Sequence, residues 1–158
     1  MTLPDLQHFL DAQDARRGGA TAYDVARAEL ERGRKTTHWI WFIFPQIPLG
    51  TSPMAARYAL QDREDAEAYL AHAILGPRLV DMATLVLGHL ERGSAPDTLM
   101  GSNLDALKLA SSMTLFDRVA AASHPECPPR EFERVLDALA THRTARCAAT
   151  LRWWDTTR

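Results

Sequence analysis

Residues 38–46 read HWIWFIFPQ and form the most aromatic stretch in a chain of 158 residues. They include two of the four Trp and two of the five Phe residues, so they belong in the core or in a pocket wall. A strand buried on both faces would suit this composition, but no second strand-like run is present to pair with it. We therefore expect a helix or an irregular buried segment that ends before Pro45.

Elsewhere, apolar residues recur at helical spacing, and Gly, Pro, Asp and Ser residues stand where helices would begin or end. Ser52–Pro53 and Asp62–Asp65 are typical of helix starts. The expected helices cover residues 5–10, 23–33, a short segment from 52, 62–72, 76–93, 102–122, 131–139 and 144–154. The sequence predicts an all-α fold, a compact bundle of about seven helices, with residues 1–158 in a single globular domain.

Composition and charge limit the class of protein. The chain is 46% hydrophobic and 24% charged with a net charge of −2, and no window approaches the roughly 18 apolar residues of a membrane span. We expect a cytoplasmic protein without a secretory signal, without membrane association and without general affinity for nucleic acid. Cys127 and Cys147 have no CxxC or Cys/His spacing around them, so we expect reduced thiols, no metal site and no cofactor.

Residues 101–117, GSNLDALKLASSMTLFD, are the second informative segment. On a helix, Asp105, Lys108 and Ser112 fall in one narrow stripe flanked by large apolar residues, so the helix is expected to be largely buried. A buried Asp and Lys need partners, and the pair is either a structural brace or part of a site. Ser111, Ser112 and Thr114 are unusual inside a helix unless they bond to the preceding turn, accompany a bend or contact a ligand.

Two cationic residues, Arg34 and Lys35, precede the aromatic stretch, and His38 is its first residue. Positive charge beside flat rings suits a phosphate-bearing, nucleotide-like ligand, whereas the structural alternative is a packed aromatic core with a hydrogen-bonded histidine. The glycines form no GxxxxGK[ST] or GxGxxG loop, and the histidines form no HExxH motif. Nucleoside triphosphate hydrolysis, Rossmann-type dinucleotide binding and a helix-borne metal site are therefore disfavoured.

Four segments carry a family resemblance: FLDAQ, GRKTTHWIWFIFPQIPLGTS, YLAHAILGPRL and GSNLDALKLASSMTLF. In order and spacing, over about Leu6 to Leu139, they resemble the bacterial family called domain of unknown function 1810, sometimes labelled calpastatin. The resemblance implies a compact α-rich domain and supplies no activity. Calpain inhibitors of that name are disordered and polar, unlike this periodic sequence. The chain departs from the family pattern at Ala73, where we expect proline.

We predict that the protein binds an anionic nucleotide- or ADP-ribose-like small molecule between residues 38–46 and the Asp105–Thr114 helix. If the protein is an enzyme, it would process this molecule there. Asp105 and His38 are the acid/base candidates. The ligand-binding candidates are Arg34, Lys35, Trp39, Trp41, Gln46, Lys108, Ser111, Ser112 and Thr114. An enzyme of this kind would be a metal-independent hydrolase, glycosidase or transferase, and a distant likeness to the ADP-ribose-processing NADAR domains supports the substrate class. The alternative is a non-enzymatic protein-interaction module in which both segments are structural core. The sequence carries no indication of an oligomeric state.

Overall fold

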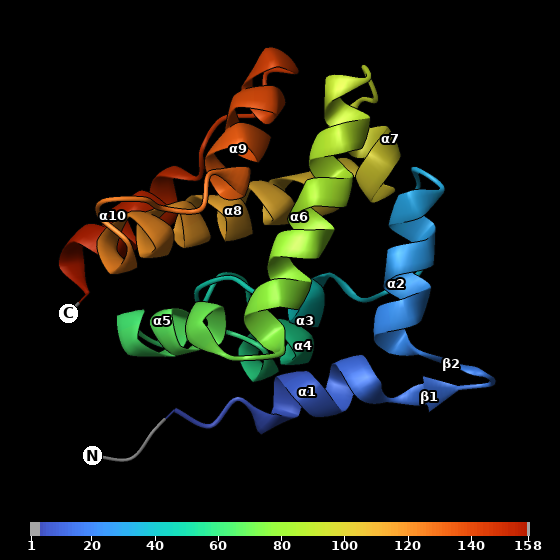
Figure 1. Cartoon of the computed structure of the whole chain (residues 1–158), viewed down its shortest axis with the longest axis horizontal. Coiled ribbons are helices and arrows are strands. Elements are labelled where there is room, and N and C mark those ends of the chain that lie inside the picture. The colour runs from blue at the N-terminus through green and yellow to red at the C-terminus, as the bar shows by residue number, and fades with distance from the viewer. Residues whose placement is uncertain (1–3, 158) are drawn as a thin grey trace.

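Helices make up nearly all the regular structure of residues 4–157, which are the residues described by this computed structural model (Figure 1). In chain order the elements are α1 (Gln7–Asp14), β1 (Arg16–Arg17), β2 (Ala20–Thr21), α2 (Ala22–Glu31), α3 (Ile40–Ile43), α4 (Pro53–Arg57), α5 (Arg63–Ala71), α6 (Leu75–Glu91), α7 (Pro96–Met100), α8 (Asn103–Ser123), α9 (Glu131–Thr141) and α10 (Ala148–Thr156). Seven of these ten helices have at least seven residues, which confirms the predicted all-α class and size of the bundle.

Side-chain caps start several helices where the sequence indicated. The hydroxyl of Ser52 accepts from the Ala55 backbone N–H at 3.1 Å, and the Asp62 carboxylate accepts from Asp65 at 2.9 Å. Ser102 does the same for α8, with its hydroxyl 3.0 Å from the Asp105 nitrogen. Each cap satisfies a backbone donor that the first turn of a helix leaves without an intrahelical partner.

The small antiparallel hairpin of β1 and β2 was not predicted. It pairs Arg16 with Thr21 and Arg17 with Ala20, and Gly18 at its tip has a φ of +70°. Two-residue strands carry no periodic pattern, so alternating hydrophobicity could not reveal them.

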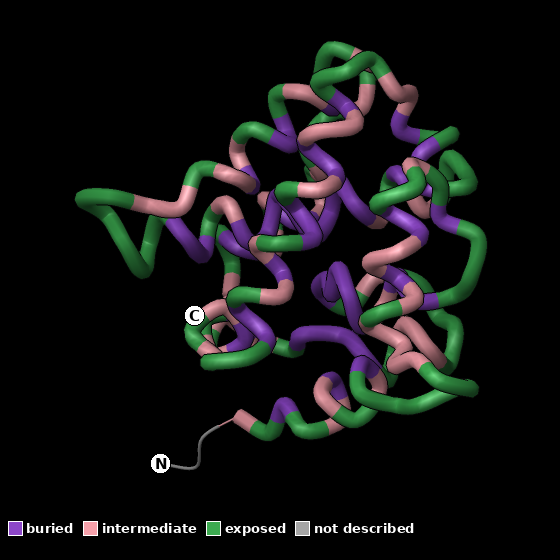
Figure 2. Tube along the Cα trace, turned by 45° about the vertical axis from the view of Figure 1, so that its right-hand side comes forward, coloured by how far each residue is buried: buried purple, intermediate pink, exposed green. Residues whose placement is uncertain are grey.

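The two longest helices form the frame of the molecule. In Figure 1, α8 runs horizontally through the centre and α6 runs upright in front of it, while α9 packs against both. Helices α5, α7 and α10 also pack on α8, and α1 and α2 contact each other below and beside α6. Figure 2 shows that buried stretches gather in the interior and that most connecting loops are exposed. The result is one connected hydrophobic cluster.

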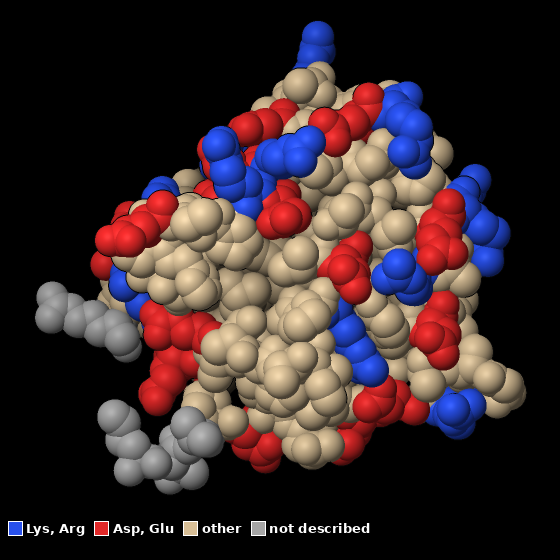
Figure 3. All heavy atoms as spheres, in the orientation of Figure 1, with Lys and Arg blue, Asp and Glu red and all other residues tan. Residues whose placement is uncertain are grey.

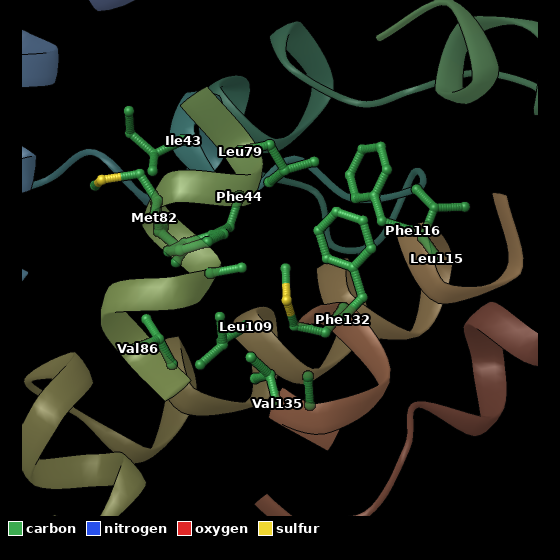
Figure 4. Packing of buried hydrophobic residues seen from close by; sticks show 14 of the residues in the cluster. Ile43, Phe44, Leu79, Met82, Val86, Leu109, Leu115, Phe116, Phe132 and Val135 are labelled. Carbon is green, nitrogen blue, oxygen red and sulfur yellow. The ribbon is translucent and has the colours of Figure 1, made fainter. Parts of the chain in front are cut away.

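The centre of that cluster brings α3, α6, α8 and α9 together (Figure 4). Phe44, Met82, Phe116 and Phe132 are all completely buried there, and the rings of Phe116 and Phe132 lie 5.9 Å apart between centroids. Burying a large aromatic side chain contributes roughly 1.5–3 kcal/mol by area, so these contacts are a main source of the folding free energy.

The aromatic stretch adopts the predicted form. Its central residues make the single helical turn α3, and Phe44, with a φ of −121° and a ψ of 73°, ends the turn directly before Pro45. Helical geometry is disfavoured in a residue that precedes proline, because it clashes with the proline ring. Trp39 and Phe42 are buried, whereas Trp41 is partly exposed.

The prediction that the Asp105–Thr114 helix is largely buried is right from Leu109 onward and wrong for its first turns. Leu104 and Leu107 are 62% and 48% exposed, so apolar residues do not enclose the polar stripe on that side. The later turns of this helix are covered, because Phe116 packs against Tyr69 of α5 and Phe132 of α9, whereas the first turns lie at the surface.

Among residues 4–157 no single helix is both long and apolar enough to cross a membrane. Helices α5 and α6 reach that length and hydropathy only when taken together, across a bend of 84°.

Candidate functional site

The segment between α2 and α3 is built around the buried carboxylate of Glu29, which sequence reasoning missed. Glu29 is 1% exposed. Its Oε1 accepts from the backbone nitrogens of Thr36 at 2.6 Å and Thr37 at 2.9 Å, and its Oε2 accepts from the Thr37 hydroxyl at 2.5 Å. The indole N–H of Trp39 donates to Oε1 at 3.0 Å. A buried carboxylate is tolerated when donors surround it in this way.

These donors also decide the protonation state of Glu29. Burial acts to raise the pKa, but the hydrogen bonds from Thr37, Thr36 and Trp39 outweigh it and lower the pKa from 4.5 to about 2. The carboxylate is therefore ionised at neutral pH and holds the indole of Trp39 in a fixed orientation. A sequence signal existed, because Glu29 lies on the same helix face as the buried Ala26 and Leu30.

Lys35 is the second buried charge of this segment, at 6% exposure. Its ammonium lies 2.8 Å from Asp105 Oδ2 and donates to the carbonyl oxygen of Thr37 at 2.5 Å. The same ammonium stands over the Trp39 ring, 5.0 Å from its centroid. The backbone of Lys35 is also fixed, because its N–H donates to the Leu99 carbonyl at 2.8 Å. Lys35 thus braces the segment against α7 and the first turn of α8.

Asp105 and Lys108 contact the aromatic segment, through Lys35 and the Trp41 ring. Lys108 Nζ lies 3.5 Å from Asp105 Oδ1 and 4.7 Å from the centroid of the Trp41 ring. One carboxylate therefore faces two ammonium groups, and each ammonium also lies over a tryptophan ring. This arrangement agrees with the structural interpretation of the Asp105–Lys108 pair, to which it adds Lys35.

The hydroxyl-bearing residues of α8 are buried more deeply than Asp105 and Lys108. Ser111 donates to the Leu107 carbonyl at 3.1 Å and Thr114 to the Ala110 carbonyl at 2.7 Å, which is the bonding to the preceding turn that the sequence offered as one alternative. Thr114 also accepts from the backbone N–H of Cys147 at 3.0 Å, so it faces the start of α10. Ser112 is completely buried.

Two further predicted site residues, Gln46 and Arg34, are fixed through their backbones. Gln46 is buried, and its backbone carbonyl accepts from the Leu60 nitrogen at 2.9 Å. Arg34 is exposed, and its backbone nitrogen donates to the Glu29 carbonyl at 3.1 Å.

A cavity of about 710 Å³ lies on another side of the aromatic segment. Its lining comes from α1, the hairpin, the start of α2, residues 37–42, α4 and Tyr58, through the residues Ala12, Ala15, Arg17, Ala22, Val25, Thr37, His38, Trp39, Phe42, Met54 and Tyr58. Of the predicted site residues, His38 and Trp39 line this cavity, whereas Lys35, Asp105 and Lys108 do not. The lining contains three aromatic rings, one guanidinium and no carboxylate.

Buried hydrogen bonds hold the aromatic wall of this cavity in place. The side chain of Gln13 donates to the Phe42 carbonyl at 2.8 Å, and the Tyr69 hydroxyl donates to the same oxygen at 3.4 Å. Arg78 donates to Gln13 Oε1 at 3.0 Å, so the network ties α1, α3, α5 and α6 together. Burial raises the pKa of Tyr69, which keeps its hydroxyl a donor.

Charge on the molecular surface seen in Figure 3 is mixed. On the face shown in Figure 3, Lys and Arg side chains alternate with Asp and Glu, so an anion would be attracted by local groups and not by a field of one sign. Residues 4–157 contain no group of three His, Cys, Asp or Glu side chains placed to hold a metal ion.

Comparison with known proteins agrees with the resemblance found in the sequence. The model of the family described as "Protein of unknown function (DUF1810)" matches residues 3–152. The crystal structure of the conserved hypothetical protein Rv1873 from Mycobacterium tuberculosis superposes with a TM-score of 0.78 at 37% sequence identity, over 97% of this chain and 98% of that one. A search among curated proteins found no match.

Proposed function

We propose that this chain, which belongs to the DUF1810 family, binds a small anionic molecule with a flat ring, of the nucleotide- or ADP-ribose-like class. The site we propose is the cavity bounded by α1, α2, α4 and residues 37–42. The observation that carries the proposal is the lining of that cavity, in which an aromatic wall meets Arg17 and His38 without any carboxylate.

The size and rigidity of the cavity support binding. A volume of about 710 Å³ is in the range of small-molecule sites, which are commonly roughly 300–1,000 Å³. Trp39, which is 2% exposed, closes the inner wall of the cavity in an orientation already set by Glu29 and Lys35. A ligand that packs against this wall therefore loses little free energy to ordering the protein.

Anion recognition would come from Arg17 and His38, which also line the cavity. Arg17 lies on β1 and presents a guanidinium that can form two parallel hydrogen bonds to a phosphate or carboxylate. His38 adds a second donor, and a positive charge when it is protonated. Because no Asp or Glu lines the cavity, an anion entering it meets no like charge from the lining.

The two lysines first considered as anion ligands receive a different role in this proposal. Lys35 and Lys108 are directed at Asp105, so we assign them to positioning Trp39 and Trp41. Asp105, held between two ammonium groups and outside the cavity lining, is a poor general base for a ligand in the cavity. We therefore propose binding and assign no catalytic step.

The test is a thermal-shift screen of the whole chain with AMP, ADP-ribose, ribose 5-phosphate and inorganic phosphate. A ligand present at about 100 times its dissociation constant adds roughly 2.7 kcal/mol to the stability of the folded state. Arg17→Gln should weaken the binding of the stabilising ligand about tenfold or more, since it removes a charge-assisted contact. Arg16→Gln is the matched control, because Arg16 is the neighbouring exposed residue of β1 and does not line the cavity. A screen without any stabilising ligand, or equal effects of the two variants, would refute the proposal.

One observation favours the alternative, an interaction module. Leu104 and Leu107 are exposed three residues apart on α8, on one helix face. In that case the ligand screen is negative, and binding of a protein partner is lost in the Leu104→Asp, Leu107→Asp double variant while Arg17→Gln leaves it unchanged.

A further inference from the structure

Tyr58 is a buried residue in the lining of the cavity. It is 7% exposed and directly follows α4, where its backbone N–H donates to the Met54 carbonyl oxygen at 3.1 Å. Its ring packs against the rings of Phe9 and Phe42, each with a centroid separation of 5.7 Å, and against that of His8 at 5.8 Å. Backbone and ring contacts therefore hold this side chain in the cavity wall.

The hydroxyl of Tyr58 differs from those of the other two tyrosines in the chain. The Tyr69 hydroxyl donates to the Phe42 carbonyl oxygen at 3.4 Å. The Tyr23 hydroxyl accepts from the Arg27 guanidinium at 3.5 Å. The Tyr58 hydroxyl has no hydrogen-bond partner among the residues that the structure describes, and its oxygen is not enclosed by protein. Because a buried tyrosine hydroxyl normally has a partner, this one is free to serve a molecule that enters from outside.

The other uncharged polar groups of the lining already have partners. The Thr37 hydroxyl donates to Glu29 Oε2 at 2.5 Å, and the Trp39 indole N–H donates to Glu29 Oε1 at 3.0 Å. The remaining polar side chains are the guanidinium and the imidazole that the proposed function assigns to the anion. Within this lining, the Tyr58 hydroxyl is thus the donor left for the uncharged part of a ligand.

We propose that Tyr58 is a specificity-determining residue, whose hydroxyl donates to an acceptor atom on the edge of the ligand's flat ring. This role rests on the proposed function, because it concerns a ligand in the same cavity. It narrows the ligand class to heteroaromatic rings of the purine or pyrimidine kind, which carry nitrogen or oxygen acceptors. A hydrocarbon ring would displace water from the hydroxyl without replacing the hydrogen bond, and is disfavoured for that reason.

The experiment measures by titration calorimetry the affinity of the whole chain for AMP, 1-naphthyl phosphate and ribose 5-phosphate. The naphthyl compound has a flat ring without acceptors, and ribose 5-phosphate has the sugar and phosphate without a base. Tyr58→Phe keeps the ring and removes the hydroxyl, so it should weaken AMP binding about three- to tenfold, the equivalent of one uncharged hydrogen bond. It should leave the binding of the other two compounds unchanged. Equal weakening for either of them, or unchanged AMP binding, would overturn this role of Tyr58.

Tyr23→Phe is the matched control. Tyr23 lies on α2 next to Ala22, which lines the cavity, but its own side chain does not line it. Its replacement should leave all three affinities unchanged. If Tyr58→Phe has no effect on AMP while Arg17→Gln weakens it, the role of Tyr58 is refuted and the proposed function stands. If AMP does not bind the wild-type chain, the role of Tyr58 is also refuted, and the wider ligand screen decides the proposed function separately.

A second measurement needs no variant and covers the case in which Tyr58→Phe folds poorly. N-acetylimidazole, which acetylates accessible tyrosine hydroxyls, should modify Tyr58 in the free chain, as read by peptide mass spectrometry. Saturating AMP should protect Tyr58 and leave the reactivity of Tyr23 unchanged, whereas 1-naphthyl phosphate should protect Tyr58 less. A Tyr58 hydroxyl that AMP does not protect would overturn the proposed contact.

Discussion

Replacing Glu29 with Gln should destabilise the protein strongly, and by an amount that depends on pH. The carboxylate is 1% exposed and accepts from Thr36, Thr37 and Trp39. Lowering its pKa from 4.5 to about 2 corresponds to about 3 kcal/mol of stability at neutral pH. Gln keeps the size and one acceptor but loses the charge, so we expect a loss of about 2–3 kcal/mol at pH 7.

The sign of the pH dependence follows from the lowered pKa. Because the folded protein holds Glu29 ionised more strongly than the unfolded chain does, this contribution is complete above about pH 5 and is lost as the pH falls toward 2. Urea unfolding of both proteins at pH 7, 5, 4, 3 and 2.5 measures it. The stability gap between wild type and Glu29→Gln should shrink steadily below pH 5.

Glu31→Gln is the matched control on the same helix. Its side chain is 53% exposed and pairs with Arg27 at 3.1 Å, so its replacement should cost about 0–1 kcal/mol. A gap for Glu29→Gln that stays constant from pH 7 to 2.5, or that is no larger than that of the control, would refute the role given to the buried carboxylate.

Three further changes test the surrounding structure by urea unfolding. Asp105→Asn leaves the ammonium of Lys35 buried without a carboxylate and should cost about 3–5 kcal/mol, and a loss under 1 kcal/mol would contradict the brace. Gly101→Ala places a Cβ 2.6 Å from the Lys35 carbonyl at a φ of +82°, so it should destabilise more than Gly18→Ala, which meets open space at a φ of +70°. Equal losses of stability in the two variants would show that the backbone at Lys35 moves away from the new Cβ. Tyr69→Phe removes one donor to the Phe42 carbonyl and should cost about 1 kcal/mol, and no loss would mean that Gln13 alone satisfies that oxygen.

Local signals explain why the helices could be predicted. Capping depends on a side chain and a backbone group three residues apart, as at Ser52, Asp62 and Ser102, and the sequence contains both partners. The end of α3 at Phe44 is similarly local, because the following proline restricts it.

Non-local contacts explain what could not be predicted. Lys35 and Asp105 are 70 positions apart, and no periodicity connects a loop residue with a helix residue. The cavity combines Arg17, Val25, Trp39 and Met54 from four different segments, so its lining exists only after the chain has folded. The exposure of Leu104 likewise depends on how far the neighbouring helices reach along α8.

The proposed binding site and the stability of the fold share one segment, and this decides how function can be tested. Trp39 lines the cavity while its indole N–H and its ring are held by Glu29 and Lys35. Any substitution on that wall changes the folding free energy and the shape of the site together, so lost binding there would be ambiguous. Arg17 also lines the cavity, but it is exposed and belongs to the two-residue strand β1. A loss of ligand affinity in Arg17→Gln at unchanged melting temperature can therefore come only from the cavity itself.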